Sequence, residues 1–162
     1  MKSMTAPEPS AALDLDAFMP YLVNVLARRF STELATVYQA RFGISIAEWR
    51  VIAHLAQNKK VSVREIYARV AMDKSKVSRA AARLEGAGIV EKKTGAADRR
   101  LVELQLTRKG RRLYGQIEPL ALAYERESLS PLSLRERGLF RALVGKLLNG
   151  GTAQGIERRV GR

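Results

Sequence analysis

Apolar residues recur every three or four positions along most of the chain, a spacing typical of amphipathic helices. The first such stretch begins at Leu15 and runs to Phe42, where Gly43 is well placed to end a helix. Pro20 fits this stretch if a short turn comes first and the main helix begins at the proline. The pattern therefore predicts one long N-terminal helix.

Three later helices are predicted by a serine followed three residues later by a glutamate. The pairs are Ser45/Glu48, Ser62/Glu65 and Ser133/Glu136, each directly before apolar residues. In such a capping box the two side chains bind backbone N–H groups that a helix start leaves without partners. Asp73 is placed to cap one more helix, which would end at Gly86 or Gly88.

The spacing of apolar residues then changes from helical to alternating. Residues 89–94 have strand character, residues 95–100 are typical of a turn, and residues 102–106 alternate between apolar and polar side chains. This predicts an antiparallel β-hairpin. Thr107 is placed to cap a following helix, which Pro119 is expected to bend or break.

These elements predict a mainly α fold with a small β-hairpin wing. Three short helices and a hairpin over residues 45–106 form a winged helix-turn-helix. Residues 15–44 and 107–149 form a helical dimerisation region around it, and residues 1–14 and 150–162 are flexible tails, the second of them basic.

The dimer is expected because the flanking helices carry more apolar residues than one winged helix can cover. These residues are Leu113, Ile117, Leu120 and Leu122, with further ones over 18–25 and 139–148. A two-fold dimer would bury them and would match a palindromic operator. The alternative is an ordinary, larger monomeric core.

Positive charge is concentrated in the middle of the chain. The chain has a formal net charge of +13, and residues 59–112 hold 16 Lys and Arg against 6 Asp and Glu. Such an excess indicates nucleic-acid binding first and attachment to an anionic membrane second. No apolar run is long enough to span a membrane, and no export signal precedes the first helix, so we expect a cytoplasmic protein.

The helix after the tight turn is the element that enters the DNA major groove in a winged helix. Its apolar positions, Val77, Ala80, Ala81 and Leu84, are expected to face the core, with Ala80 to Ala82 allowing close packing. The side chains left facing outward are Lys74, Ser75, Lys76, Ser78, Arg79 and Arg83. Ser62, at the preceding helix start, would direct N–H groups toward a phosphate.

Two adjacent arginines, Arg99 and Arg100, occupy the predicted tip of the hairpin. Like charges side by side repel each other unless an anion receives them, and the minor groove has a negative potential that attracts arginine. Asp98 could pair with Arg100 and fix its pose. Taken alone, the hairpin tip has a simpler alternative as a solvated loop, and the basic helix has one as a helix with a solvated face. The helix, the tip and the concentration of charge together favour DNA binding.

The run Asp98-Arg99-Arg100, followed by Leu104, Leu106, Thr107 and Gly110, resembles the wing signature of the MarR family of bacterial transcription regulators. The family's recognition helix and first wing strand are similar to the run MDKSKVSRAAARLEGAGIVEKK, and its second helix is similar to FGISIAEWRVIAHL. The resemblance implies a homodimeric repressor of triangular shape. It also implies that Arg100 enters the minor groove beside Asp98, with Ser75, Ser78 and Arg79 near the bases.

Members of this family commonly release DNA when a small aromatic acid binds. The resemblance therefore implies an effector, here an aromatic carboxylate or its coenzyme A thioester. Candidate residues for its site are Phe18, Tyr21, Arg28, Trp49, Arg50 and His54. Each has a simpler alternative: Phe18 and Trp49 as core residues, Arg50 as half of an ion pair, and His54 as an ordinary packed or surface histidine.

The absence of cysteine and the single histidine argue against a thiol redox sensor and a zinc site, so neither a metal nor a cofactor is expected. The sequence shows none of the patterns that indicate an enzyme: a nucleophile with a base, a glycine-rich phosphate loop, or paired carboxylates on one helix face. The main alternative function is a low-specificity, nucleoid-type DNA-binding protein, whose affinity would depend on salt rather than on sequence.

Overall fold

The computed structural model describes residues 13–58, 61–62, 65–66, 72–94 and 102–150. The chain divides into two compact units, Met1–Leu120 and Ala121–Arg162. The first unit holds every described element up to residue 106 and the start of the long helix α5 (Arg108–Ser128); the second unit holds the end of α5 and the helix α6 (Leu134–Asn149). Among the described residues, no helix is long and apolar enough to cross a membrane.

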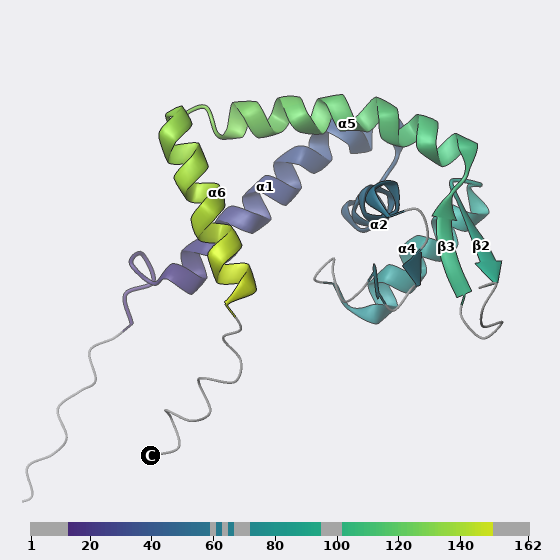
Figure 1. The fold of residues 1–162 in the computed structure, drawn as a ribbon, viewed down its shortest axis with the longest axis horizontal. Helices are drawn as coiled ribbons and strands as arrows, with labels where there is room; N and C mark the ends of the chain where they lie inside the picture. Colours follow the sequence, from purple (N-terminus) through teal and green to yellow (C-terminus); the bar gives the residue numbers. More distant parts are fainter. Residues whose placement is uncertain (1–12, 59–60, 63–64, 67–71, 95–101, 151–162) are drawn as a thin grey trace, which may run out of the picture. The chain divides into compact units, whose positions relative to one another are not determined.

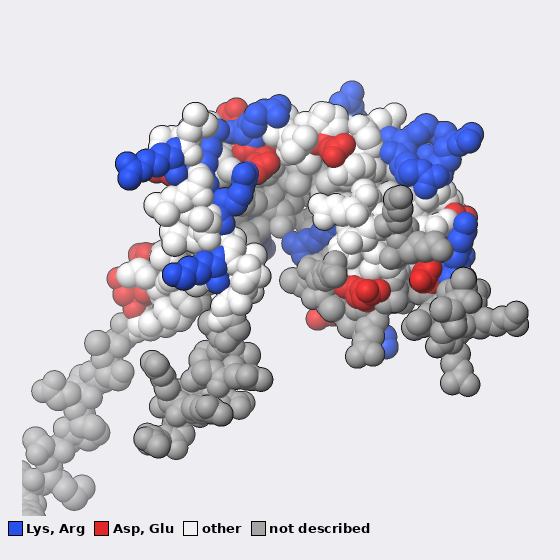
Figure 2. All heavy atoms as spheres, viewed as in Figure 1, with Lys and Arg blue, Asp and Glu red and all other residues white. Residues whose placement is uncertain are grey.

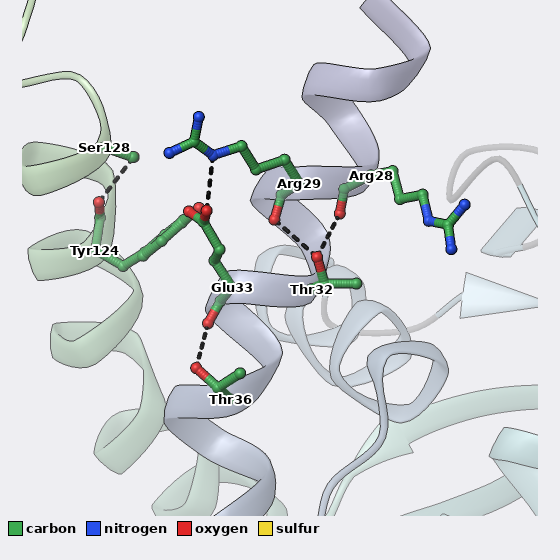
Figure 3. A network of polar contacts seen from close by, with 7 residues as sticks. All are labelled: Arg28, Arg29, Thr32, Glu33, Thr36, Tyr124 and Ser128. Carbon is green, nitrogen blue, oxygen red and sulfur yellow. Dashed lines mark hydrogen bonds and ion pairs between the residues drawn. The ribbon is translucent and has the colours of Figure 1, made fainter.

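The predicted N-terminal helix is α1, Met19–Phe42, with Pro20 in its first turn. It ends at Gly43, whose φ of 65° is a left-handed conformation that glycine adopts without a steric penalty. Both predicted boundaries are therefore confirmed. On its exposed side Arg29 Nε donates to Glu33 Oε1 at 2.7 Å, and the Thr32 hydroxyl donates to the Arg28 carbonyl at 2.9 Å (Figure 3).

Helices α2 (Ile46–Gln57) and α4 (Lys74–Gly86) pack against each other in the first unit (Figure 1). The capping box predicted for α2 is present: Ser45 N donates to Glu48 Oε2 at 2.7 Å, and Glu48 N donates to Ser45 Oγ at 3.3 Å. Between these helices Glu65 and Ile66 are helical, and Ile66 is fully buried.

The predicted hairpin is confirmed as strands β2 (Val90–Thr94) and β3 (Val102–Leu106), paired antiparallel from Val90–Leu106 at the base to Thr94–Val102. A third strand, β1 (Val61–Ser62), pairs with β3, so the sheet order is β1-β3-β2. The sequence did not predict β1, because two residues cannot display an alternation. Ser62, expected at a helix start, lies in this strand.

The core of the first unit lies where α2, α4 and the sheet meet. Its fully buried side chains include Tyr38, Ile52, Ile66, Leu84, Leu104 and Ile117. Ile117 was expected in a dimer interface; instead it is fully buried in this core, and Leu113 packs against the same cluster. These two residues are therefore already used within a single chain.

Helix α5, Arg108–Ser128, begins where predicted, with the Thr107 hydroxyl accepting a hydrogen bond from Gly110 N at 3.1 Å. Of the bend or break expected at Pro119, the break is wrong, since α5 continues through the proline. A proline removes one hydrogen bond from this 21-residue helix, and the buried side chain of Ile117 helps to hold the turn before it.

The second unit contains α6, Leu134–Asn149, and the last turns of α5. The capping box predicted at Ser133 is present, with Ser133 N donating to Glu136 Oε2 at 2.8 Å. Arg141 Nη2 lies 3.1 Å from Glu125 Oε1 and joins α6 to α5. Within α5, Ser128 Oγ donates to the Tyr124 carbonyl at 2.8 Å (Figure 3).

Candidate nucleic-acid interface

Helix α4 separates apolar and polar residues as the sequence predicts. The apolar positions Val77, Ala80, Ala81 and Leu84 are all buried. The polar positions Lys74, Ser75, Lys76, Ser78, Arg79 and Arg83 are all exposed. Ala82, expected to help close packing, is exposed instead, so only Ala80 and Ala81 allow α4 to approach its support.

The start of α4 differs in one detail from the expected cap. Asp73 occupies the N-cap position, but its side chain makes no capping hydrogen bond. Its carboxylate instead pairs with Lys76 Nζ at 3.3 Å. The first N–H groups of a helix have no partner within it. The first turn of α4 therefore combines backbone donors with the exposed side chains of Lys74 and Ser75, a combination suited to phosphate.

Two arginines on α4 are held in different ways. Arg79 Nε donates to the Ser75 carbonyl at 3.3 Å, so its guanidinium lies back along the helix toward the N-terminus. Arg83 Nε lies 3.1 Å from Glu48 Oε1. Glu48 is only 4% exposed, and its other oxygen accepts the capping bond from Ser45 N. Arg83 thus ties the end of α4 to the start of α2, a role that the sequence did not reveal.

The structure describes only one of the remaining predicted DNA-contacting residues. Ser62 lies in β1, and Asp98, Arg99 and Arg100 lie outside the described residues. The hairpin register does fix where their segment is attached: it follows Thr94 and precedes Val102, at the end of the hairpin away from α5.

A cluster of four cations, Arg108, Lys109, Arg111 and Arg112, lies at the start of α5, at the opposite end of the hairpin (Figure 2). Lys109 Nζ donates to the Ala87 carbonyl at 2.8 Å, and Arg111 Nη1 donates to the Leu106 carbonyl at 2.6 Å. These residues were not among the predicted DNA contacts, although the run TRKGRR contributes to the excess of positive charge in the middle of the chain.

Gly110 lies inside this cluster and allows α5 to pass close to the start of the hairpin. A Cβ atom on Gly110 would lie 2.1 Å from the Ile89 carbonyl oxygen. The same carbonyl accepts hydrogen bonds from Thr107 N at 3.0 Å and from the Thr107 hydroxyl at 3.2 Å. The end of α4, the hairpin base and α5 are therefore fixed to one another.

A cavity of about 470 Å³ lies next to this junction. It is lined by the α1–α2 connection, the first turn of α2, the last turn of α4 and the first turns of α5. Its lining combines apolar side chains with the cations Arg83, Lys109 and Arg112.

The predicted effector residues Trp49 and Arg50 lie on the side of α2 that faces α1. Trp49 is half-buried and stacks on Tyr114, with ring centroids 6.0 Å apart and planes 13° apart. Arg50 Nη2 donates to Ser31 Oγ on α1 at 3.1 Å. Burial raises the pKa of the nearby Tyr38 hydroxyl to about 12, although the positive charge of Arg50 opposes the shift.

The other effector candidates are more dispersed. Phe18 and Tyr21 are exposed at the start of α1, and at 1.5 Å per residue Phe18 lies about 20 Å along the helix from Ser31. Arg28 is exposed, and His54 is half-buried near the end of α2. The described contacts of a single chain therefore gather Trp49 and Arg50 but do not bring Phe18 and Tyr21 to them.

Comparison with known proteins agrees with this architecture. The sequence profile of the MarR family matches residues 42–112, from the end of α1 to the start of α5. A MarR/EmrR family transcriptional regulator from Acinetobacter sp. ADP1 is 29% identical, with a TM-score of 0.78 over 85% of this chain and 97% of that one. The segment 42–112 is thus similar to the MarR family.

Two other solved structures share the fold at lower identity. BpsR from Bordetella bronchiseptica, whose DNA binding is regulated by 6-hydroxynicotinic acid, is 20% identical, with a TM-score of 0.76 over 85% of this chain and 97% of its own. PcaV from Streptomyces coelicolor, solved with its natural ligand, is 22% identical, with a TM-score of 0.70 over 86% and 98%. No match to the chain is found among curated proteins.

The structure thus has the winged-helix fold of MarR-family transcriptional regulators. In that fold α4 is the recognition helix and the β2–β3 hairpin is the wing. Among the described residues, no group of three or more His, Cys, Asp or Glu side chains is arranged to hold a metal ion.

Proposed function

We propose that the protein is a homodimeric transcriptional repressor that binds a palindromic operator. One α4 from each chain enters the major groove, and Arg100, with Asp98 beside it, enters the flanking minor groove. Arg79, Ser75 and Ser78 contact base edges, while Lys74, Lys76, Arg83, Arg99 and Ser62 contact phosphates or groove edges. Residues 15–44 and 107–149 form the dimerisation region, and the protein acts in the cytoplasm.

The observation that carries this proposal is the division of α4 into two faces. One face is buried against α2 and the sheet, and the other presents four cations and two serines to solvent. Arginine can form two hydrogen bonds to guanine, the serine hydroxyl can donate or accept a hydrogen bond, and lysine neutralises phosphate charge. An exposed helix of this composition on a winged-helix support is suited to the major groove.

The proposal includes a small-molecule effector because one of the similar structures is regulated by such a molecule. DNA binding by BpsR is regulated by 6-hydroxynicotinic acid, a small aromatic acid. We propose that a compound of this class, or its coenzyme A thioester, releases this protein from DNA. Trp49 and Arg50 support the proposal, since an aromatic ring beside a guanidinium can stack a ligand ring and bind its carboxylate.

The experiment selects DNA from a random duplex library and then measures affinity for the selected duplex and for random DNA at several salt concentrations. A specific regulator should prefer its selected duplex by about a thousandfold or more. Equal affinity for both, with a steep salt dependence, would instead show the nucleoid-type alternative.

Arg79→Ala tests the proposed reading of bases by α4. We expect the variant to lose about 1–3 kcal/mol of binding free energy for the selected duplex and to tolerate base changes better. Arg135→Ala, which removes an exposed arginine from α6, is the control and should bind like the parent protein. If the parent protein, Arg79→Ala and Arg135→Ala bind the selected duplex equally well, the proposed contact between α4 and the bases is wrong.

A further inference from the structure

The four cations at the start of α5, hereafter the α5 cluster, lie at the far end of the helix that is proposed to read the operator. Lys109 Nζ donates to the carbonyl of Ala87, directly after the last residue of α4, whereas the residues proposed to contact bases begin at Ser75. At 1.5 Å per residue the two ends of α4 are about 18 Å apart. The members of the α5 cluster are Arg108, Lys109, Arg111 and Arg112.

The cluster is also at the far end of the hairpin from the wing tip (Figure 1). Arg111 Nη1 donates to the carbonyl of Leu106, the last residue of β3. The close approach of Gly110 to the Ile89 carbonyl fixes the start of α5 against the hairpin base. The cluster is therefore held on a rigid support, which reduces the entropy that binding would cost.

The positive charge of the cluster is not neutralised by the described residues. None of its four side chains makes an ion pair in the described part of the chain, and the first acid along α5 is Glu118. Arg108 and Arg112 also make no hydrogen bond with a described residue, and Arg111 uses one of its five N–H donors. Figure 2 shows the cluster as a compact group of cationic side chains on the surface of the first unit.

The composition of the cluster favours a phosphate backbone over a protein partner. Protein interfaces gain most of their binding energy from a few aromatic or apolar side chains in buried pockets. The segment from Arg108 to Arg112 exposes no apolar side chain, because its one uncharged residue, Gly110, is buried. Binding through charge alone is instead the way in which proteins hold duplex DNA without reading its sequence.

The three arginines of the cluster are placed to act together. Arg108, Arg111 and Arg112 are three or four residues apart in α5, a spacing that puts them on one side of the helix. A guanidinium group is planar and matches a phosphate with two parallel hydrogen bonds. One side of the first turns of α5 therefore offers several phosphate ligands at once.

We propose that the α5 cluster binds the phosphate backbone of a second DNA duplex, at the end of α4 and of the wing that faces away from the operator. A protein bound to its operator would then bridge to another part of the same DNA molecule. The second duplex is bound without regard to sequence, since the cluster contacts phosphates only. This inference rests on the proposed function for the first duplex, so the two contacts are measured separately.

The experiment uses two short duplexes with different dyes. The selected duplex is first saturated with the full-length protein, and fluorescence cross-correlation then measures whether a random-sequence duplex diffuses together with it. The parent protein should carry both duplexes on one particle. Absence of co-diffusion at a salt concentration at which the selected duplex is bound overturns the proposal. A protein with no preference for the selected duplex fails the proposed function instead, and co-diffusion is then measured between two random duplexes.

Two double variants with equal net charge locate the second contact. Arg108→Ala/Arg112→Ala should weaken capture of the second duplex at least about tenfold and lower its salt slope by about two, one for each lost phosphate contact. It should bind the selected duplex alone as the parent does. Arg126→Ala/Arg135→Ala removes two exposed arginines from the end of α5 and from α6 and should leave capture unchanged. All four side chains lack partners among the described residues, so both variants should keep the parent melting temperature.

Three results would contradict the second site. Unchanged capture by Arg108→Ala/Arg112→Ala, or an equal loss in the two double variants, would mean that the bridge does not form at the cluster. Weaker binding of the selected duplex alone by Arg108→Ala/Arg112→Ala would mean that the cluster contacts the operator itself. Displacement of the second duplex by poly-glutamate as effectively as by DNA of equal charge would mean that the cluster fits acidic polymers in general.

Discussion

At the scale of single residues, Gly110 shows how one missing side chain fixes the junction of helix and wing. A Cβ atom there would lie 2.1 Å from the backbone oxygen of Ile89, a contact that only movement of the backbone can relieve. Gly110→Ala should therefore lower the free energy of unfolding by about 1–3 kcal/mol, as overpacking usually does.

Gly115 on the same helix provides a matched control. No atom outside its own helix backbone and chain neighbours lies within 4 Å of a Cβ placed there, so Gly115→Ala should be neutral or stabilise by up to about 1 kcal/mol. Urea unfolding followed by the fluorescence of Trp49, the single tryptophan, measures both variants. Equal stability of the two variants would contradict the close approach of α5 to Ile89.

Tyr38 gives the first unit a dependence on high pH. Burial raises the pKa of its hydroxyl from the ordinary 10 to about 12, so the folded state holds the proton more tightly than the unfolded state does. The resulting stability is fully present below pH 10 and is lost as the pH rises through about 12. The loss is about 1.4 kcal/mol per pH unit over that interval, or about 3 kcal/mol in all.

Tyr38→Phe should remove this contribution to the pH dependence, and Tyr21→Phe, at an exposed position on the same helix, should not. The measurement is the difference in unfolding free energy between each variant and the parent protein, from pH 9 to pH 12. Since lysines titrate in all three proteins, only the differences report on the tyrosine. An identical pH slope in Tyr38→Phe and the parent would contradict the assignment.

At the scale of elements, the Arg83–Glu48 pair fixes the recognition helix α4 against α2. Glu48→Gln keeps the size of the side chain but removes its charge from both the capping box and the ion pair. We expect the free energy of unfolding, measured by Trp49 fluorescence, to fall by about 1–3 kcal/mol, the usual range for a hydrogen bond to a charged group. Arg83 is largely exposed, so water can solvate it once its partner is neutral.

The second capping box is the control for this prediction. Ser133 and Glu136 at the start of α6 have the same arrangement, but Glu136 is exposed and belongs to the second unit. Glu136→Gln should therefore leave the Trp49 transition nearly unchanged. A similar loss in Glu136→Gln would show that the Trp49 transition is not specific to the first unit, and it would contradict the particular contribution expected of the Glu48–Arg83 pair.

These elements also show what the sequence could predict. Helix ends at Gly43, Ser45 and Ser133 follow from local backbone chemistry, and the alternation over β3 follows from a half-buried strand, so all were predictable. Strand β1 exists because β3 offers it a partner, and the continuity of α5 through Pro119 depends on packing. Such features are set by contacts distant in sequence.

The candidate site divides in the same way. The exposed and buried positions of α4 follow from helical spacing, and the structure confirms them. The partner of Arg83 lies 35 positions earlier in the chain, and Lys109 reaches Ala87 from another element. No local pattern identifies either contact. The cavity is likewise formed by several segments distant in sequence, and no local pattern predicts it.

At the scale of the whole molecule, the outstanding feature is apolar surface that a single chain leaves exposed. Helix α6 has no buried residue, although its sequence contains a continuous apolar stripe. The exposed members of that stripe are Leu139, Phe140, Leu143, Val144, Leu147 and Leu148. The first turns of α1 expose a further group, namely Phe18, Met19, Tyr21, Leu22, Val23 and Val25. An exposed apolar stripe of this length on a single helix, such as that of α6, marks an interaction site.

A second copy of the chain is the partner that we expect, because obligate homodimer interfaces are the large and apolar ones. Sedimentation at micromolar concentration should give twice the chain mass of 18.0 kDa. Leu143→Lys places a charge within the apolar stripe of α6 and should shift the protein toward monomer. Ala142→Lys adds the same charge to the opposite face of the same helix, and this variant should remain a dimer. If the parent protein sediments as a monomer, or if both variants dissociate equally, α6 does not form the interface, and the two half-sites of an operator would have to be occupied by independent chains.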